Sequence, residues 1–371
     1  MMIPVSEPWI GEEELIKVTE AIRNGEISGT FGTTLTEFEH RFAGYCGCKY
    51  GIATSSGTTA LHLAVSAAGI GSGDEILVSA STNIATALAI VHNGAVPVPV
   101  DSERTSWNLD LDLLEQYITP STRAIIPVHL FGHPVDMDRL MEIASRHNLI
   151  VIEDCAEAHG AKCRGRVTGS FGDMGCFSFY ANKIITTGEG GMVVTNDAAL
   201  AKQLKLLRNL GFTQPRFKHD VLGFNFRMTG YQAAMGLAQL DRIETIIQKK
   251  RELAKAYTDQ LCALDEISVP AQADWAEHVY WMYGIVVNRG SKVTRDQLAE
   301  RLHTAGIETR TFFCPMNQQP CLQAIKAFRS LPCPVADELW DQGLYLPSSP
   351  QLQVEQIDYI ASAVKKSLRV G

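Results

Sequence analysis

The chain has 371 residues, of which 46% are hydrophobic and 20% charged, so it is long enough for two globular domains. Its formal net charge of -8 and its lack of a long apolar run give no indication of a nucleic-acid or membrane partner. The N-terminus does not resemble a secretory signal, and the nine cysteines have no zinc-ribbon spacing, so we expect a cytoplasmic protein with reduced thiols and no metal.

Short apolar runs alternate with helical patterns between residues 49 and 196. Strands that are apolar along their whole length, and that alternate with helices, are typical of a mostly parallel sheet covered on both faces. The sequence therefore predicts an α/β domain. Its expected strands are "YGIAT", "EILVS", "VPVPVD", "RAIIPVHL", "LIVIEDC", "CFSFY" and "GMVVTN".

The pattern becomes helical from about residue 198, and its second helical run, residues 232–264, is long enough to bridge two domains. Shorter strand and helix patterns follow, which indicate a smaller α+β domain. We expect a large α/β domain at residues 1–245, whose first 15 residues form an N-terminal arm, and a small C-terminal domain at residues 246–371.

The stretch "ATSSGTTALHLAV", residues 53–65, reads as the end of a strand, a turn and the start of a helix. Unpaired N–H groups at the start of a helix attract anions, and the hydroxyls of Ser56, Thr58 and Thr59 lie beside them in the sequence. Serine and threonine are also common N-cap residues. Alone, this motif is compatible with a phosphate site or with a simple helix cap.

A second motif, "LIVIEDCAEAHGA", places Glu153 and Asp154 at the end of a buried strand. Ligands of open α/β sheets bind at the carboxyl ends of the strands. One of these carboxylates has a purpose there if it faces a protonated ring nitrogen. Capping of the next helix is the alternative explanation.

A third motif, "FSFYANKIITTGEGG", carries Ser178 and Lys183 on either side of a strand end. Most lysines in such a position are surface charges, but a lysine whose pKa is lowered by its surroundings can form an imine with an aldehyde. A fourth motif, "GFNFRMTGYQAA", places Asn225 and Arg227 just before a helix, and by itself it suggests only a structural loop.

Together the motifs specify one cofactor. A phosphate turn, an acid for a pyridine nitrogen and a lysine for an aldehyde are the groups that pyridoxal 5'-phosphate requires of a protein. Their order along the chain, with the lysine 29 positions after Asp154, matches a fold-type I enzyme of the aspartate aminotransferase-like class.

On these motifs the chain resembles the DegT/DnrJ/EryC1/StrS family of sugar-nucleotide aminotransferases, and within it the GDP-perosamine synthases. The resemblance runs nearly end to end and implies a large domain built on a mostly parallel seven-stranded sheet. It rests on "SGTTALHLAV", "PVHLFGHPVDMD", "VIEDCAEAHGA", "GSFGDMGCFSFYANKIITTGEGGMVVTND" and "GFNFRMT".

The resemblance implies a role for each motif. Lys183 would be the covalent anchor of the cofactor, and Asp154 would pair with its ring nitrogen. Asn225 would reach the phosphate of a neighbouring subunit, which implies a homodimer with shared sites or a higher oligomer. The implied cofactor contacts are Ser56, Gly57, Thr58, Asn83, Asp154, Glu157, Ser178, Lys183 and Asn225.

The implied reaction is transfer of an amino group from L-glutamate to a nucleotide-linked 4-keto-6-deoxyhexose for a cell-surface glycan such as the O antigen of lipopolysaccharide. Amination at C3, or of a dTDP- or UDP-linked keto sugar, is an alternative. A sugar dehydratase with the same cofactor is disfavoured, because dehydratases of the family carry histidine at the position of Lys183. A non-catalytic regulator on this fold is the third alternative.

Two positions depart from the family pattern. Asn83 stands where an aromatic residue usually stacks on the pyridine ring, and Asn317 stands where a histidine usually serves the sugar end of the site. The expected substrate contacts are, besides Asn317, a residue of the strand before it and three residues of the segment "GEISGTFG", namely Phe312, Ile27, Ser28 and Gly29.

Overall fold

A seven-stranded sheet forms the centre of the computed structural model, which describes residues 2–215 and 217–369. Strand β9 runs antiparallel to its two neighbours, β1 and β8. The remaining pairs, which join β8, β5, β4, β2 and β3 in this order, are all parallel. The mostly parallel sheet is thus confirmed. In spatial order the strands are β1 (Tyr50–Thr54), β9 (Gly191–Thr195), β8 (Met174–Ser178), β5 (Ile150–Asp154), β4 (Thr122–Ile126), β2 (Glu75–Ser79) and β3 (Val96–Val100).

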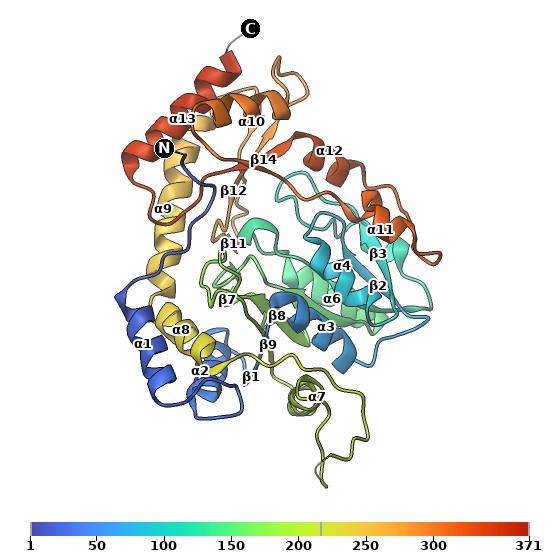
Figure 1. Cartoon of the computed structure of the whole chain (residues 1–371). Coiled ribbons are helices and arrows are strands. Elements are labelled where there is room, and N and C mark those ends of the chain that lie inside the picture. Colours follow the sequence, from blue (N-terminus) through green and yellow to red (C-terminus); the bar gives the residue numbers. More distant parts are fainter. Residues whose placement is uncertain (1, 216, 370–371) are drawn as a thin grey trace.

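Helices cover both faces of this sheet because its strands are apolar on both sides (Figure 1). In β2, Ile76 and Val78 pack in one hydrophobic cluster with Leu61, whereas Leu77 between them packs with Leu140 in another. The first face carries α3 (Gly57–Ala67), α4 (Ile84–Val91) and α7 (Ala198–Arg208). The other carries α2 (Thr34–Tyr45), α5 (Leu114–Tyr117), α6 (Met137–His147) and α8 (Gly230–Asp241), with α1 (Glu12–Arg23) packed on α8.

The C-terminal part forms a second, antiparallel sheet with a hydrophobic cluster of its own. Its strand order is β10 (Ile267–Ser268), β12 (Tyr283–Val287), β14 (Gly343–Leu346) and β13 (Arg310–Thr311). The helices that contribute to this cluster are α9 (Ile243–Leu261), α10 (Arg295–Thr304) and α13 (Val354–Arg369). Smaller elements are η1 (Leu130–Gly132), η2 (Met316–Gln318), α11 (Pro320–Gln323), α12 (Pro334–Gln342) and the sheet of β6 (Lys162–Cys163), β7 (Arg166–Val167) and β11 (Ala276–Glu277).

The long helical run predicted at residues 232–264 is two helices. Arg242, with φ -112° and ψ 2°, leaves the helical conformation and separates α8 from α9. Helix α9 then joins the two hydrophobic clusters: Ile243 packs with the large sheet's helices, and Tyr257 packs under the second sheet. Hydrophobic periodicity alone does not register such a break, because the apolar stripe continues across it.

Within residues 2–215 and 217–369, the structure contains no helix that is both long and apolar enough to cross a bilayer. All nine cysteines are free, and five of them are among the buried apolar residues of the main clusters, namely Cys46, Cys48, Cys155, Cys163 and Cys176. These thiols therefore fill space in the core.

Candidate active site

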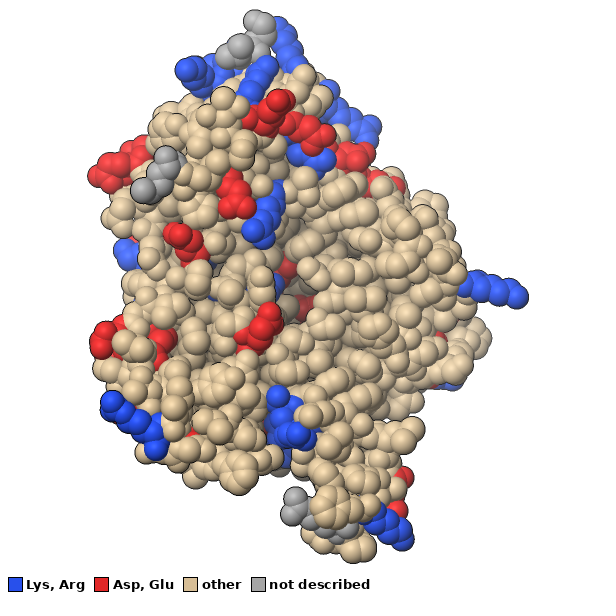
Figure 2. All heavy atoms as spheres, viewed as in Figure 1, with Lys and Arg blue, Asp and Glu red and all other residues tan. Residues whose placement is uncertain are grey.

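A cavity of about 380 Å³ lies at the carboxyl ends of the parallel strands, with one wall from the C-terminal part of the chain. Figure 2 shows this face of the molecule hollowed near its centre, with acidic and basic atoms inside the hollow. Residues from three of the four sequence motifs meet in the cavity wall, together with Asn83. Those present are Ser56, Gly57, Thr58, Asn83, Asp154, Glu157, Ser178 and Lys183.

The turn before α3 forms one end of the cavity. The Thr59 N–H donates to Ser56 Oγ at 3.1 Å, and the Ser56 N–H donates to Thr59 Oγ1 at 2.9 Å, so a capping box fixes the start of the helix. Gly57 and Thr58 are the first two residues of α3, and their N–H groups have no acceptor within the helix.

Gly57 also packs closely against the end of β8. A Cβ atom at Gly57 would lie 2.6 Å from the Cβ of Ser178, so only glycine allows this approach. The approach brings the Ser178 hydroxyl beside the start of α3, in the same cavity wall. Two free N–H groups and a hydroxyl at a helix N-terminus are a donor set that suits a phosphate.

Asp154 ends β5 and is 4% exposed. Its Oδ2 accepts a hydrogen bond from the Thr86 hydroxyl at 2.8 Å, and its Oδ1 accepts one from the Ala156 N–H at 3.1 Å. Burial raises the pKa of this carboxyl, while the two donors and the Lys183 amine favour its charged form. The side chain is therefore held in one orientation, facing the cavity.

Lys183 lies opposite two carboxyl groups. Burial lowers the pKa of its amine, while the carboxylates of Glu157 and Asp154 oppose that shift. Burial raises the pKa of Glu157 to about 7, against the nearby amine and a 2.7 Å hydrogen bond from the Phe131 N–H to its Oε2. The lowered pKa of the Lys183 amine increases the share of its neutral form, which is the form that a nucleophilic lysine requires.

Sequence analysis did not find several residues of this site, and two of them contact the predicted catalytic side chains. Thr86, which orients Asp154, lies in the first turn of α4, three residues after Asn83, and its spacing gave a weak signal at most. Trp281 gave none. It precedes β12 and reaches the cavity from the C-terminal part, where the centre of its ring lies 3.8 Å from Lys183 Nζ.

Asn83 lines the cavity without contributing a ring. It is the N-cap residue of α4, and its Oδ1 accepts a hydrogen bond from the Ala85 N–H at 3.0 Å. Asparagine at this position therefore stabilises the start of α4 as its N-cap. The aromatic residues of the wall come from other segments: Tyr180, Trp281, Phe313 and Tyr345.

The expected substrate contacts lie outside the walls of this cavity. Phe312 is 1% exposed and packs against Phe131, while its neighbour Phe313 lines the cavity. The Asn317 side chain donates to Asp337 Oδ1 at 3.0 Å. Ile27 is 56% exposed.

A second cavity, of about 770 Å³, contains part of the segment predicted to contact substrate. Ser28 lines it together with Arg227 and Asn209, whereas Gly29 packs so close to Met228 that a Cβ atom would lie 2.2 Å from its carbonyl oxygen. Asn225 forms a β-bridge with Asn209 and does not reach the first cavity. Within one chain, therefore, Asn225 and Arg227 stay outside the first cavity. The fourth motif still contacts the first, because the Ser55 N–H donates to the Phe226 carbonyl at 2.9 Å.

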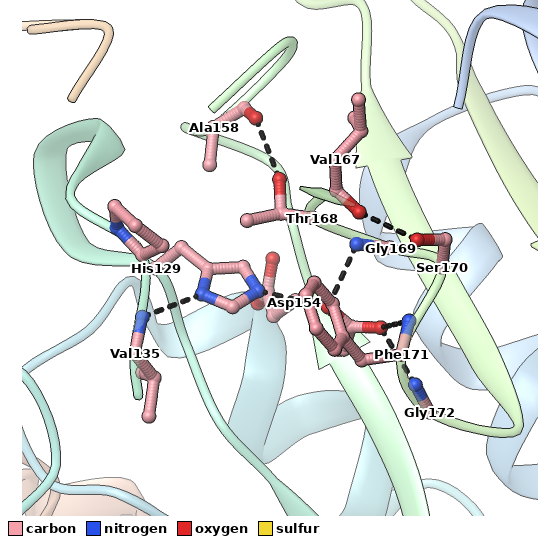
Figure 3. Close-up of polar contacts among 12 residues, drawn as sticks. His129, Val135, Asp154, Ala158, Val167, Thr168, Gly169, Ser170, Phe171 and Gly172 are labelled. Atoms are coloured by element: carbon pink, nitrogen blue, oxygen red, sulfur yellow. Dashed lines mark hydrogen bonds and ion pairs between the residues drawn. The ribbon is translucent and has the colours of Figure 1, made fainter. Parts of the chain in front are cut away.

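Glu153, the other acid of the second motif, is not part of the cavity wall and instead organises a loop. Figure 3 labels Gly169, Phe171 and Gly172 of this loop. Its carboxylate accepts the N–H groups of Gly169, Phe171 and Gly172 at 2.7 to 2.8 Å. His129 Nε2 donates to the same carboxylate at 3.2 Å, because His129 Nδ1 is occupied by the Val135 N–H at 3.0 Å.

Potential metal ligands occur close together at this point. His129, Glu153 and Cys155 place their ligand atoms within 4.8 Å of one another, and all three residues are buried. The polar atoms of His129 and Glu153 are already engaged in the hydrogen bonds that hold the loop at residues 169–172. The two adjacent acids thus have different tasks, one structural and one in the cavity.

The family model of DegT/DnrJ/EryC1/StrS aminotransferases matches residues 8–365. The chain belongs to this family. It is 44% identical over 368 residues to a GDP-perosamine synthase of Caulobacter vibrioides, covering 99% of this chain and 98% of that one. It is 39% identical over 369 residues to a dTDP-3-amino-3,4,6-trideoxy-alpha-D-glucose transaminase of Streptomyces venezuelae, covering 98% and 96%.

Among solved structures, Spr1654 from Streptococcus pneumoniae in its PLP-form superposes with a TM-score of 0.93 at 29% identity, covering 99% of this chain and all of that one. Membership of the family confirms the fold-type I aminotransferase architecture expected from the sequence. In this aminotransferase the cavity fits pyridoxal 5'-phosphate: phosphate donors lie at the turn before α3, and Lys183 and Asp154 face the same space.

Proposed function

We propose that the protein is a PLP-dependent aminotransferase that transfers the amino group of L-glutamate to C4 of a GDP-linked 4-keto-6-deoxyhexose, as a GDP-perosamine synthase does. One observation carries this proposal. A lysine with a lowered pKa, a buried carboxylate and a phosphate-binding turn, which lie as far as 126 positions apart, line one cavity. A binding protein would not require a nucleophilic amine at that point.

When bound, pyridoxal 5'-phosphate supplies an aldehyde for the lysine and a ring that accepts electrons. The N–H groups of Gly57 and Thr58 and the Ser178 hydroxyl would hold its phosphate. Asp154 keeps a negative charge opposite the ring nitrogen, and the Thr86 hydroxyl fixes the direction in which that charge points. Glu157 lies beside the lysine and is positioned by the Phe131 N–H.

Lys183 has two tasks in this scheme. It would hold the cofactor covalently, and its amine, when free, would take the proton from the α carbon of the donor. Burial lowers the pKa of this amine, which keeps a share of it neutral and able to accept that proton. In the second half of the reaction, at the carbonyl carbon of the keto sugar, Lys183 would return a proton.

The choice of a GDP-linked sugar rests on the similarity to the GDP-perosamine synthase of Caulobacter vibrioides. This identity, 44%, is only slightly higher than the 39% identity to the dTDP-3-amino sugar transaminase of Streptomyces venezuelae. Amination at C3 of a dTDP- or UDP-linked keto sugar is therefore the second candidate. A panel of GDP-, dTDP- and UDP-linked keto sugars with glutamate separates the two by mass spectrometry and NMR of the product. Turnover confined to a dTDP or UDP sugar would overturn the first candidate and retain the enzyme class.

The remaining expectations extend the same proposal. The cavity has walls from both parts of the chain, which supports a division into two domains at residues 245/246, within α9. Nine free thiols support a cytoplasmic location. An amino sugar attached to a nucleotide is an activated building block, which supports a role in making a cell-surface polysaccharide such as the O antigen.

We also place the enzyme in a homodimer. Two large apolar side chains are exposed. Phe31, which lines the second cavity, is 66% exposed, and Leu222, which lies in the chain between the cavity-lining residues Gln214 and Arg227, is 95% exposed. Asn225 lies in the same segment as Leu222 and does not line the cavity of its own chain. A second copy over this surface would bury the apolar side chains and bring its Asn225 to the neighbouring phosphate site.

Mixing two inactive variants tests the shared site. Asn225→Ala removes the proposed phosphate contact, and Lys183→Ala removes the lysine that would bind the cofactor. When the two variants are co-expressed, some of the dimers contain one chain of each. If Asn225 acts across the interface, each mixed dimer has one intact site, so about a quarter of the wild-type activity is expected from random assembly. No gain over the separate variants would show that Asn225 acts within its own chain or not at all.

Light scattering provides the matching test of the surface itself. Leu222→Asp is expected to shift the protein toward monomer, because it puts a charge into the proposed apolar interface. Val354→Asp serves as a control, since Val354 is also exposed (66%) and starts α13 at the far end of the chain. Equal masses for wild type and Leu222→Asp would contradict this interface.

A further inference from the structure

Trp281 connects the lysine to the C-terminal part of the chain. Its ring centre lies 3.8 Å from Lys183 Nζ, and its indole N–H donates to the carbonyl oxygen of Asn182 at 2.7 Å. One side chain therefore contacts both the amine of Lys183 and the backbone just before it. Trp281 is 3% exposed, so these contacts are shielded from bulk water.

The backbone of Trp281 is held on both sides. Its N–H donates to the Phe131 carbonyl at 2.8 Å, and its carbonyl accepts a hydrogen bond from Lys250 Nζ at 2.9 Å. Lys250 also donates to the Ser348 carbonyl, and it is 2% exposed in α9. Burial of a lysine costs free energy unless its donors are satisfied. The hydrogen bonds to the carbonyls of Trp281 and Ser348 therefore stabilise Lys250 in this buried position.

The face of an aromatic ring attracts a cation through its quadrupole, and this attraction strengthens where water is excluded. At Lys183 it favours the protonated amine, as do the carboxylates of Asp154 and Glu157, whereas burial opposes it. Glu189 and Arg310 line the same cavity, and the buried imidazole of His159 also interacts electrostatically with Lys183. Trp281 is the member of this set that also binds the lysine's own loop.

We propose that Trp281 is the positioning residue of Lys183: its ring holds the free ammonium while the lysine is detached from the cofactor, and its N–H fixes the loop from which the amine returns. Lys250 in turn positions Trp281. The inference rests on the proposed function, because it assigns a task to the lysine between two covalent states. It also gives the cavity an aromatic group that acts on the amine, although Asn83 provides no ring.

Measuring the pH at which Lys183 loses its proton in the cofactor-free protein tests the role of the Trp281 ring directly. The protein is labelled with trinitrobenzenesulfonate over a range of pH, and the Lys183 peptide is quantified by mass spectrometry. Trp281→Leu removes the ring, so the pH midpoint of labelling is expected to fall by about half to one unit. Trp281→Phe keeps a ring and should keep most of the shift.

Phe313→Leu is the matched control, because Phe313 is an aromatic residue of the same wall and Trp281 is the ring under the amine. Its midpoint is expected to equal that of the wild type. Lys250→Met leaves the ring in the chain but removes its support, and it should lower the midpoint in the same direction. This second variant decides the matter if Trp281→Leu does not fold, as judged by circular dichroism.

An unchanged midpoint in both Trp281→Leu and Lys250→Met would overturn the inference, and so would an equal fall in the Phe313→Leu control. Cofactor uptake by the wild type, measured by absorbance and by borohydride fixation on Lys183, separates this from failure of the proposed function. Uptake with an unchanged midpoint rejects only the role of Trp281. Absence of uptake rejects the aminotransferase itself.

Discussion

Lys183→Ala is expected to abolish transamination, with a fall in rate of roughly four orders of magnitude or more, as for removal of a residue on which every chemical step depends. The alanine cannot form the bond that anchors the cofactor, and it cannot carry the proton from the donor's α carbon. Borohydride treatment followed by mass spectrometry should therefore find no adduct on residues 177–191. A single turnover with glutamate, followed by absorbance, measures the loss of the first half-reaction.

The wild-type fold should survive this change, because Lys183 forms no salt bridge with the residues that the structure describes and its amine rests on the Trp281 ring. Lys202→Ala, which removes an exposed lysine of α7, is the matched control and should retain full activity and the adduct. A borohydride-fixed adduct in the Lys183→Ala protein would move the anchor to another lysine and contradict the assignment. Added methylamine provides a further check, since an external amine can partly replace a missing proton carrier.

The sheet could be predicted from the sequence because its strands are apolar on both faces. Strand β2 coincides with the run "EILVS", and β9 with "GMVVT" of the last predicted strand. The convergence of Asp154 and Ser178 followed from the same pattern, since they end neighbouring parallel strands, β5 and β8. Residues at the carboxyl ends of such strands meet at one edge of the sheet, whatever their separation in sequence.

Contacts made by the C-terminal part could not be predicted in this way. Trp281 reaches the lysine only because α9 and the second sheet pack against the cavity, and no local pattern encodes that docking. The predicted strand "IETRTFF" was also uncertain by one position: in the structure β13 ends at Thr311, and Phe313 rather than Phe312 lines the cavity. In extended chain, successive side chains point in opposite directions. An error of one position therefore assigns a core residue to the site, or a site residue to the core.

Asp154→Asn should lower the rate constant of transamination by roughly a hundredfold or more, by analogy with the loss of one preorganised charge partner from an enzyme site. Asparagine has nearly the same shape, and it keeps an oxygen that can accept the Thr86 hydroxyl, so the loss is one of charge. Without that charge the ring nitrogen opposite it is less readily protonated, and the bound ring accepts electrons less well. Thr86→Ala leaves the charge of Asp154 in place but removes the hydroxyl that orients this carboxylate, so it should lower the rate constant less than Asp154→Asn does.

Glu153→Gln provides the decisive comparison, because it removes a carboxylate one residue away. Glu153 faces the loop at residues 169–172, where it accepts three backbone N–H groups and the His129 N–H, so its loss should lower the urea midpoint of unfolding. Its rate per folded molecule should stay within a few-fold of the wild type. The opposite pattern, with Asp154→Asn active and Glu153→Gln stable but inactive, would exchange the tasks of the two acids. Since they are neighbours on one strand, whose side chains alternate between the two faces of the sheet, both results together locate the charge that the chemistry uses.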